Sequence, residues 1–157
     1  VDIDFSIGQI KNVKFINILN DALDFSESKV SILNINAENI GDKAVSSGEN
    51  SIIQIDNLEC ENSFIGVANK DGSSLILTNS KFKNIITPFA AYKKKNAYNN
   101  ADMTVTNIIV KNYKSKFFLS DEASLRIDDK IVKKNYLNKN ILKIIYDKRS
   151  NLIRNYQ

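Results

Sequence analysis

The chain has 157 residues and a net charge of +4, from 22 basic and 18 acidic side chains. With 43% hydrophobic and 25% charged residues it has the composition of one globular domain that can bury a core. No apolar stretch reaches the roughly 18 residues of a transmembrane helix. The net charge is mild, and arginine occurs only at Arg126, Arg149 and Arg154, so the sequence does not predict a nucleic-acid interface.

The sequence contains no histidine and one cysteine, Cys60. This composition excludes Ser–His–Asp and Cys–His catalysis, histidine general bases and the commonest zinc sites, so we predict no catalytic residues and no cofactor. A single cysteine also excludes an intrachain disulfide. The first residues, Val1 to Phe5, lack Met and the layout of a signal peptide, so we expect a processed product or a piece of a longer protein.

A repeat with asparagine in two columns runs through the first two thirds of the chain. The columns are Asn12, Asn34, Asn57, Asn79 and Asn107, and Asn17, Asn39, Asn62, Asn84 and Asn112. In each column the spacings are 22, 23, 22 and 28 residues. Asparagine in every position of both columns indicates a structural repeat rather than a composition effect.

Each unit has the alternation of a β-strand with one buried face. Val13 and Phe15 flank Lys14, and a bend at Lys11–Asn12 would return Ile10 to the same interior. Asparagine tolerates the left-handed backbone that such a bend needs, and stacked asparagines can hydrogen-bond from coil to coil. We therefore predict one asparagine stack and two buried columns: Ile10, Ile32, Ile55, Leu77 and Val105, and Phe15, Ala37, Cys60, Phe82 and Val110.

Three short strands per period of about 22 residues predict an all-β fold, a right-handed single-stranded parallel β-helix of about five or six coils. We assign residues 1–120 to the coils and residues 121–157 to a C-terminal cap of the same domain. In the cap, Leu125–Ile127 predicts one more strand with a turn at Asp128–Asp129, and residues 141–154 predict a hairpin. The N-terminal end shows no cap, so we expect a domain of the parent chain there.

Residues 1–119 resemble the pectate-lyase-like right-handed parallel β-helix superfamily, which has three sheets per coil and an asparagine ladder at a tight turn. The resemblance implies the fold, and a secreted or cell-surface location. It does not select a function, because the superfamily includes lyases, hydrolases, epimerases, adhesins and phage tail proteins.

The candidate binding site is an insertion in the coil that precedes Met103. It contains Tyr92, Lys93, Lys94, Lys95 and Tyr98. Insertions into repeats become loops on one face, where aromatic rings can stack on sugars and lysines can pair with the carboxylates of an acidic polysaccharide. The alternative interpretation is a tolerated surface loop.

A second candidate is the outward row of the first sheet, predicted to be Asp4, Asp24, Ser46, Ala68, Ala90 and Leu119. Asp4 and Asp24, one coil apart, are weak candidates for a metal site. The family's hydrolases need several Asp with a His, and its lyases need several calcium-binding carboxylates with an Arg base, and neither set is present. We expect the C-terminal segment to cover the apolar end of the row.

The sequence thus favours a non-catalytic recognition or structural module of a larger protein, with a polysaccharide or a surface protein as its partner. One alternative is a polysaccharide lyase or hydrolase. The other is a purely structural stalk or an oligomerisation module.

Overall fold

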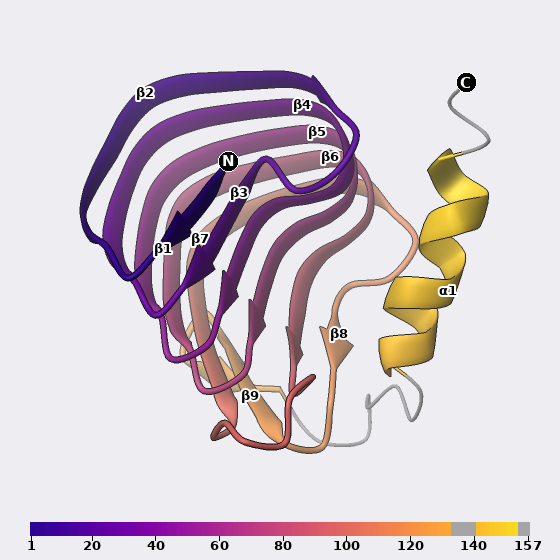
Figure 1. Cartoon of the computed structure of the whole chain (residues 1–157). Helices are drawn as coiled ribbons and strands as arrows, with labels where there is room; N and C mark the ends of the chain where they lie inside the picture. Colours follow the sequence, from indigo (N-terminus) through magenta and orange to yellow (C-terminus); the bar gives the residue numbers. More distant parts are fainter. Residues whose placement is uncertain (133–140, 154–157) are drawn as a thin grey trace.

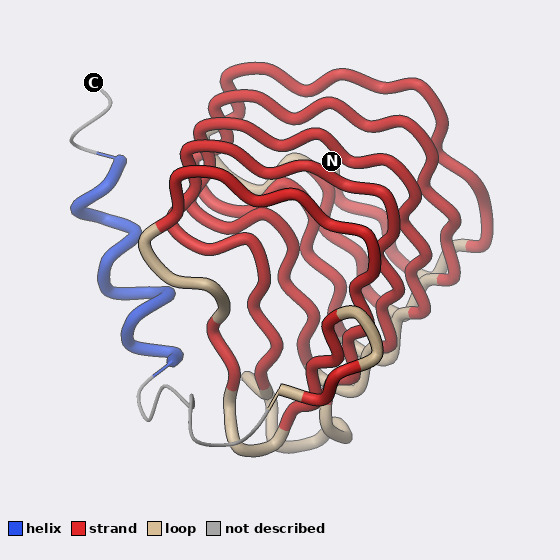
Figure 2. Tube along the Cα trace, turned by 180° about the vertical axis from the view of Figure 1, so that it is seen from behind, coloured by secondary structure: helices blue, strands red, loops and turns tan. Residues whose placement is uncertain are grey.

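The computed structural model describes residues 1–132 and 141–153, and it shows a right-handed parallel β-helix of about six coils (Figure 1). Seen from behind, the coils lie above one another with the helix α1 beside them (Figure 2). The elements are β1 (Asp2–Asp4), β2 (Ile7–Ile18), β3 (Leu23–Ser26), β4 (Lys29–Gly48), β5 (Ile52–Lys70), β6 (Ser74–Tyr92), β7 (Ala101–Tyr113), β8 (Phe118–Leu119), β9 (Ala123–Ile127), β10 (Lys130–Ile131) and α1 (Ile141–Ile153).

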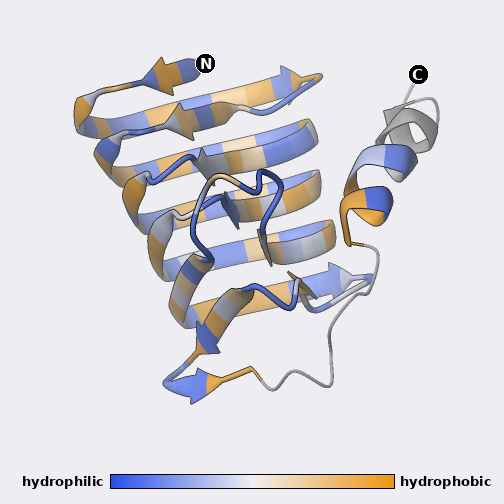
Figure 3. Cartoon of the chain, turned by 60° about the horizontal axis from the view of Figure 1, so that its bottom comes forward, coloured by the Kyte–Doolittle hydropathy of each residue, from blue (hydrophilic) through white to orange (hydrophobic). Residues whose placement is uncertain are grey.

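The strands pair in parallel, each with the strand one coil away. β2 pairs with β4, β4 with β5, β5 with β6 and β6 with β7. The three short strands expected in each coil are largely continuous, because β4, β5 and β6 bend through their turns without losing their pairing. Hydrophobic and hydrophilic residues alternate along these strands, as the colours of Figure 3 show, so one face of each strand lines the interior.

The asparagine columns form the bends of the coils, as predicted. All ten residues have φ between 52° and 62°, a left-handed conformation that asparagine adopts at low cost. Asn34 Nδ2 donates to Asn12 Oδ1 and Asn57 Nδ2 to Asn34 Oδ1, both at 2.9 Å. One bond of the first ladder has a different acceptor, because Asn79 Nδ2 donates to the carboxylate oxygen Oδ1 of Asp56 at 2.7 Å. The second column is continuous, with amide-to-amide distances of 2.9, 3.0, 3.2 and 3.0 Å.

The two predicted core columns lie inside the coils in the expected register. Their members in the inner coils are buried. Cys60 is one of these core side chains, and its burial raises the pKa of its thiol to about 12. Ile10, Phe15 and Val110 are only half-buried, which corrects the expectation of full burial. They belong to the end coils, where a side chain has a neighbouring coil on one side only.

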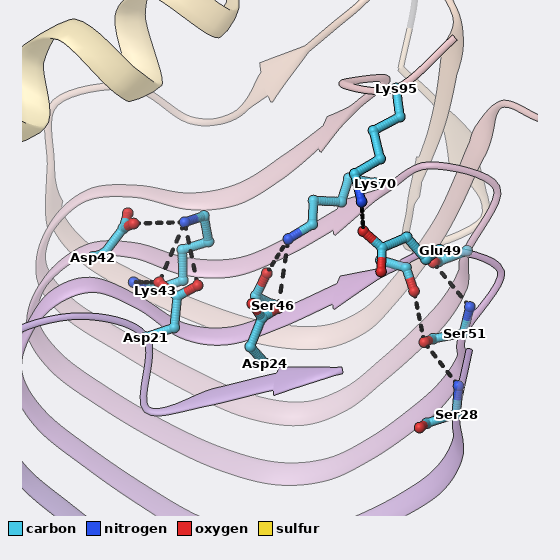
Figure 4. A network of polar contacts seen from close by, with 12 residues as sticks. Asp21, Asp24, Ser28, Asp42, Lys43, Ser46, Glu49, Ser51, Lys70 and Lys95 are labelled. Atoms are coloured by element: carbon cyan, nitrogen blue, oxygen red, sulfur yellow. Dashed lines mark hydrogen bonds and ion pairs between the residues drawn. The ribbon is translucent and has the colours of Figure 1, made fainter. Parts of the chain in front are cut away.

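A third ladder, of serines, lies at another corner, and the sequence analysis missed it. The backbone N–H groups of Ser6, Ser28 and Ser51 donate to the hydroxyl oxygens of Ser28, Ser51 and Ser73 at 3.0, 3.1 and 3.1 Å. Figure 4 shows the bond from Ser28 to Ser51. These bonds satisfy backbone donors at the turn, and the N–H group of Ser51 also donates to the carbonyl oxygen of Gly48 at 3.2 Å. The signal was present, because these four serines follow the same repeat spacing as the asparagines.

The C-terminal segment differs in part from the prediction. β9 adds a strand to β7, Asp128 and Asp129 form the turn, and β10 returns antiparallel to β9, as expected. Residues 141–153 form the helix α1 and not a hairpin strand. The apolar residues Ile141 and Ile145 are four positions apart and so share one helix face. The end of the predicted hairpin, residue 154, lies outside the described residues.

Candidate functional site

A groove of about 600 Å³ crosses five coils on the sheet face that precedes the first asparagine bend. It is formed by β2, β4, β5, β6 and β7. Its lining residues are Gln9, Lys11, Ser31, Ile32, Leu33, Gln54, Ile55, Asp56, Ile76, Thr78, Asn79, Thr106 and Asn107. The sequence analysis missed this groove, although one of its outward rows, Gln9, Ser31, Gln54 and Ile76, can be read from the repeat register.

The groove combines neutral polar groups with exposed aliphatic surface. The amide of Gln54 and the hydroxyl of Ser31 are exposed. Ile76, one coil beyond Gln54 in the same row, is 44% exposed. Asp56 accepts hydrogen bonds from Thr78 Oγ1 at 2.8 Å and from Asn79 Nδ2 at 2.7 Å. These bonds, that from Asn79 foremost, lower the pKa of its carboxyl group. The groove therefore offers the fixed carboxylate of Asp56 as an acceptor, and the exposed amide of Gln54 and hydroxyl of Ser31 as donors, to a ligand rich in hydroxyl groups.

The face between the two asparagine columns carries charges that pair from coil to coil. Lys81 Nζ lies 2.8 Å from Glu59 Oε1, and Lys83 Nζ lies 2.8 Å from Glu61 Oε1. A shallow hollow of about 210 Å³ lies among these side chains. Because the pairs are exposed and neutralise each other, this face presents little net charge to a ligand.

The inserted loop is anchored to the coils below it. Asp71 Oδ1 accepts hydrogen bonds from the backbone N–H groups of Lys94 and Lys95, each at 2.7 Å. The ammonium group of Lys95 pairs with Glu49 (Figure 4), and its hydrogen bond lowers the pKa of the Glu49 carboxyl. Lys94 Nζ lies 4.9 Å from the ring centre of Tyr146 in α1. Two of the three lysines are thus already engaged within the protein.

The predicted loop residues do not form one exposed cluster. Tyr92 is fully buried, and its hydroxyl lies 3.2 Å from that of Tyr146. Burial raises the pKa of Tyr92 well above its usual value. Its ring is therefore not available for stacking on a sugar, which corrects its place in the candidate set. Lys93 and Tyr98 are half-buried, whereas Lys94 and Lys95 are exposed.

The outward row of the first sheet is shifted at both ends, by two residues in the first coil and by one residue at Phe118. Asp2, not Asp4, stacks on Asp24, while Asp4 pairs with Ser26. At the other end, Phe118 pairs with Ala90 and faces outward. Leu119 is the next residue and joins the main core instead. A shift of two residues keeps Asp4 on the outward face but moves it away from Asp24. A shift of one residue exchanges the two faces of a strand, so the outward assignment of Leu119 was wrong.

Asp24 is held by an ion pair with a side chain of the same chain. Lys70 Nζ donates to Ser46 Oγ at 2.8 Å and lies 3.5 Å from Asp24 Oδ1 (Figure 4). Asp4 and Asp24 are not brought together by the register. Among residues 1–132 and 141–153, no group of three or more Cys, Asp or Glu side chains is arranged to hold a metal ion.

The helix α1 covers the apolar part of this row. Ile141 and Ile145 pack in a second hydrophobic cluster with Ala68, Ala90 and Phe118. The C-terminal segment thus covers Ala68 and Ala90, as expected, and lies against the side of the coil stack (Figure 1). In the part of the chain that the structure describes, no helix is both long and apolar enough to cross a membrane.

A buried lysine with two carboxylates lies next to this cluster. Lys43 Nζ is 2.7 Å from Asp42 Oδ2 and 3.2 Å from Asp21 Oδ1, and it is 5.9 Å from the ring centre of Tyr146. Burial opposes the charge of Lys43, but the two carboxylates outweigh it and raise its pKa. Burial raises the pKa of Asp21 to about 6, the neighbouring Asp42 carboxylate adds to this increase, and the attraction of Lys43 only partly offsets it.

This cluster makes stability depend on pH in an unusual direction. The folded protein keeps the Asp21 proton up to about pH 6, whereas the unfolded chain releases it near the usual value of 3.8. Unfolding between these values releases a proton, so the free energy of unfolding falls as pH rises through this window. We expect the Asp21 contribution to fall by about 2 kcal/mol between pH 4 and 7.

The measurement is urea unfolding of the wild type and Asp21→Asn at half-unit steps from pH 4 to 7. The difference between the two curves should shift in favour of the variant as pH rises. Asp2→Asn, which removes an exposed carboxylate from the first coil, is the control. A difference that is flat with pH would show that Lys43 fully compensates the burial of Asp21.

Comparison with known proteins does not extend this description. No family model matches the chain, and no curated protein or solved structure matches it significantly. The class of protein is therefore defined by its architecture, a parallel β-solenoid of about six turns.

Proposed function

We propose that this chain is a non-catalytic recognition module that binds an extended polysaccharide in the groove along its coils. The observation that carries the proposal is the groove itself, which presents amides, hydroxyls and aliphatic carbon in repeated rows over five coils. Neighbouring coils are about 4.8 Å apart, which is close to the length of one sugar ring. A polymer that runs along the stack therefore meets similar groups at each step.

The resemblance to the pectate-lyase-like superfamily supports a polysaccharide as the ligand class. A lyase or hydrolase is the alternative, and three observations weigh against it. The sequence has no histidine, and Asp24 in the outward row is paired with Lys70. The row is also covered by Ile141 and Ile145 of α1 from Ala68 onward. A secreted or cell-surface location is part of this proposal and rests on the resemblance alone.

The inserted loop remains a second candidate surface, for an acidic polysaccharide. Lys93, Lys94 and Lys95 are consecutive, and the last two are exposed. Binding to these cations would weaken with salt, because exposed charges are screened within about 8–10 Å at physiological ionic strength. Binding in the groove would depend much less on salt, since Lys11 and Asp56 are its only charged lining residues.

A glycan array followed by calorimetry tests the proposal. The double variant Ser31→Ala with Gln54→Ala should weaken binding of a hit about tenfold, because each lost hydrogen bond contributes about 0.5–1.5 kcal/mol. Both side chains are exposed, so stability should change by less than about 0.5 kcal/mol.

The matched control is the triple variant Lys93→Ser, Lys94→Ser and Lys95→Ser, which should leave affinity for a groove ligand unchanged. If instead the triple variant abolishes binding and the groove variant does not, the ligand site is the loop. An array without hits would contradict the proposal as a whole. Turnover of an acidic polysaccharide that is lost in Asp24→Ala would favour the enzyme.

A further inference from the structure

The sheet face between the two asparagine columns carries charges that are ordered by coil. Each coil contributes two outward positions to this face, and the strand register stacks them in two rows. One row is Lys14, Asn36, Glu59, Lys81 and Ile109. The other row is Ile16, Glu38, Glu61, Lys83 and Lys111. On this face β4 and β5 therefore carry only acidic charges, and β6 and β7 carry only basic charges.

This order is not the one that pairing within the chain would favour. Signs that alternate from coil to coil would give every charge two opposite neighbours. Instead, Glu38 stacks on Glu61, and Lys83 stacks on Lys111, so like charges are neighbours on both sides of the boundary between β5 and β6. Like charges on neighbouring strands repel each other. The face is thus divided into an acidic half and a basic half, which is the pattern of a surface that meets its complement.

A second copy of the same face is that complement. A two-fold axis that runs parallel to the strands, between the coils of β5 and β6, sets the acidic half of each copy against the basic half of the other. It brings together three kinds of opposite-charge pair between the copies: Glu59 with Lys81, Glu61 with Lys83, and Glu38 with Lys111. An axis along the stack would set each coil against the same coil, so that Glu59 and Glu61 of the two copies would face one another. Charge therefore selects the first arrangement.

The charged groups of this face are accessible to a partner. The side chains of Glu61 and Lys81 are 40% and 60% exposed, and those of Glu59 and Lys83 lie between these values. The hollow of about 210 Å³ among them gives room to long side chains of a second copy. The helix α1 packs on Ala68, beyond the second asparagine bend, and so lies on another side of the stack.

We propose that two copies of this chain associate through the face between the asparagine columns, with their coil stacks antiparallel. Glu59 and Lys81 of one copy then form a cluster of alternating sign with Lys81 and Glu59 of the other, and networks of this kind contribute more than isolated exposed pairs. The face is about 20 Å long, for five coils about 4.8 Å apart, and it holds charged rather than apolar groups. The dimer is therefore weak and depends on salt.

The first measurement is sedimentation velocity of the wild type over a range of protein concentrations, at low and at high salt. We expect a dimer that grows with concentration at about 0.01 M salt, where charges act over a Debye length of about 30 Å. At about 1 M salt this length is about 3 Å, and the dissociation constant should be at least about tenfold higher. The polysaccharide groove lies before the first asparagine bend, so the two proposals can fail separately.

The decisive measurement uses two charge-reversed variants of the same face. One carries Glu59→Lys with Glu61→Lys, and the other carries Lys81→Glu with Lys83→Glu. Either variant alone sets like charges against each other across the axis, so it should stay monomeric where the wild type dimerises. An equal mixture of the two restores opposite signs at these positions and should form a heterodimer. Recovery in the mixture also shows that both variants are folded.

The matched control is the double variant Asp121→Lys with Glu122→Lys. Both residues are exposed in the turn before β9, and their reversal changes the net charge as much as the reversal of Glu59 and Glu61 does. This control should dimerise as the wild type does. Wild-type monomers at every concentration at low salt would overturn the proposal. Reversed variants that each dimerise alone, or a mixture that stays monomeric, would also overturn it, because charge on this face would then not direct association.

Discussion

Replacing Lys43 by Met is expected to destabilise the protein by about 3–5 kcal/mol at pH 7. The Lys43 side chain is 3% exposed, and those of its partners Asp42 and Asp21 are 0% and 12% exposed. Methionine has a similar length but removes the cation that neutralises both carboxylates. Charge buried without compensation costs far more than the ion pair itself contributes.

Urea unfolding measures this effect, and Lys81→Met is the control. Lys81 makes an ion pair of similar length, 2.8 Å to Glu59, but both side chains are about half exposed. Its loss should cost at most about 1 kcal/mol. The cost of Lys43→Met should shrink at pH 4, where Asp21 is protonated in the folded protein. Equal costs for the two variants would mean that water reaches the Lys43 cluster.

Replacing Phe82 by Ala is expected to destabilise the protein by a similar amount, about 3–5 kcal/mol. Phe82 is 1% exposed and lies between Cys60 and Val110 in its column. Its ring packs edge-to-face on Phe89, with centres 5.5 Å apart at 81°. The strands above and below are held by continuous pairing, so the coil cannot collapse into the cavity that Ala would leave.

The control for this variant is Phe15→Ala in the same column. Phe15 is half-buried in the first coil, so its loss opens a surface notch and not a closed cavity. We expect it to cost clearly less than Phe82→Ala in the same unfolding experiment. Equal costs would indicate that the first coil is covered in solution.

The repeat could be predicted because its determinants are local. Asn34 and Asn39 adopt a left-handed backbone that few other residues tolerate, and the alternation between them assigns each side chain to one face. These two signals agree in five successive coils, so the register of the inner coils followed without any knowledge of long-range contacts. The same signals fail at the ends. No asparagine marks the first strand or the strand at Phe118, and there the predicted register slipped by two residues and by one residue, respectively.

The sequence alone determined the coil, its period, the asparagine ladders and the inner core columns, because turn chemistry and strand alternation act within one repeat. Only the tertiary structure decided where the groove lies, which lysines of the loop are engaged, and that residues 141–153 form a helix on Ala68 and Ala90. Each of these depends on which surfaces meet across coils that are 22 or more residues apart. Tyr92 shows the difference, since its place next to three lysines indicated an exposed loop, whereas contact with Tyr146 of α1 buries it.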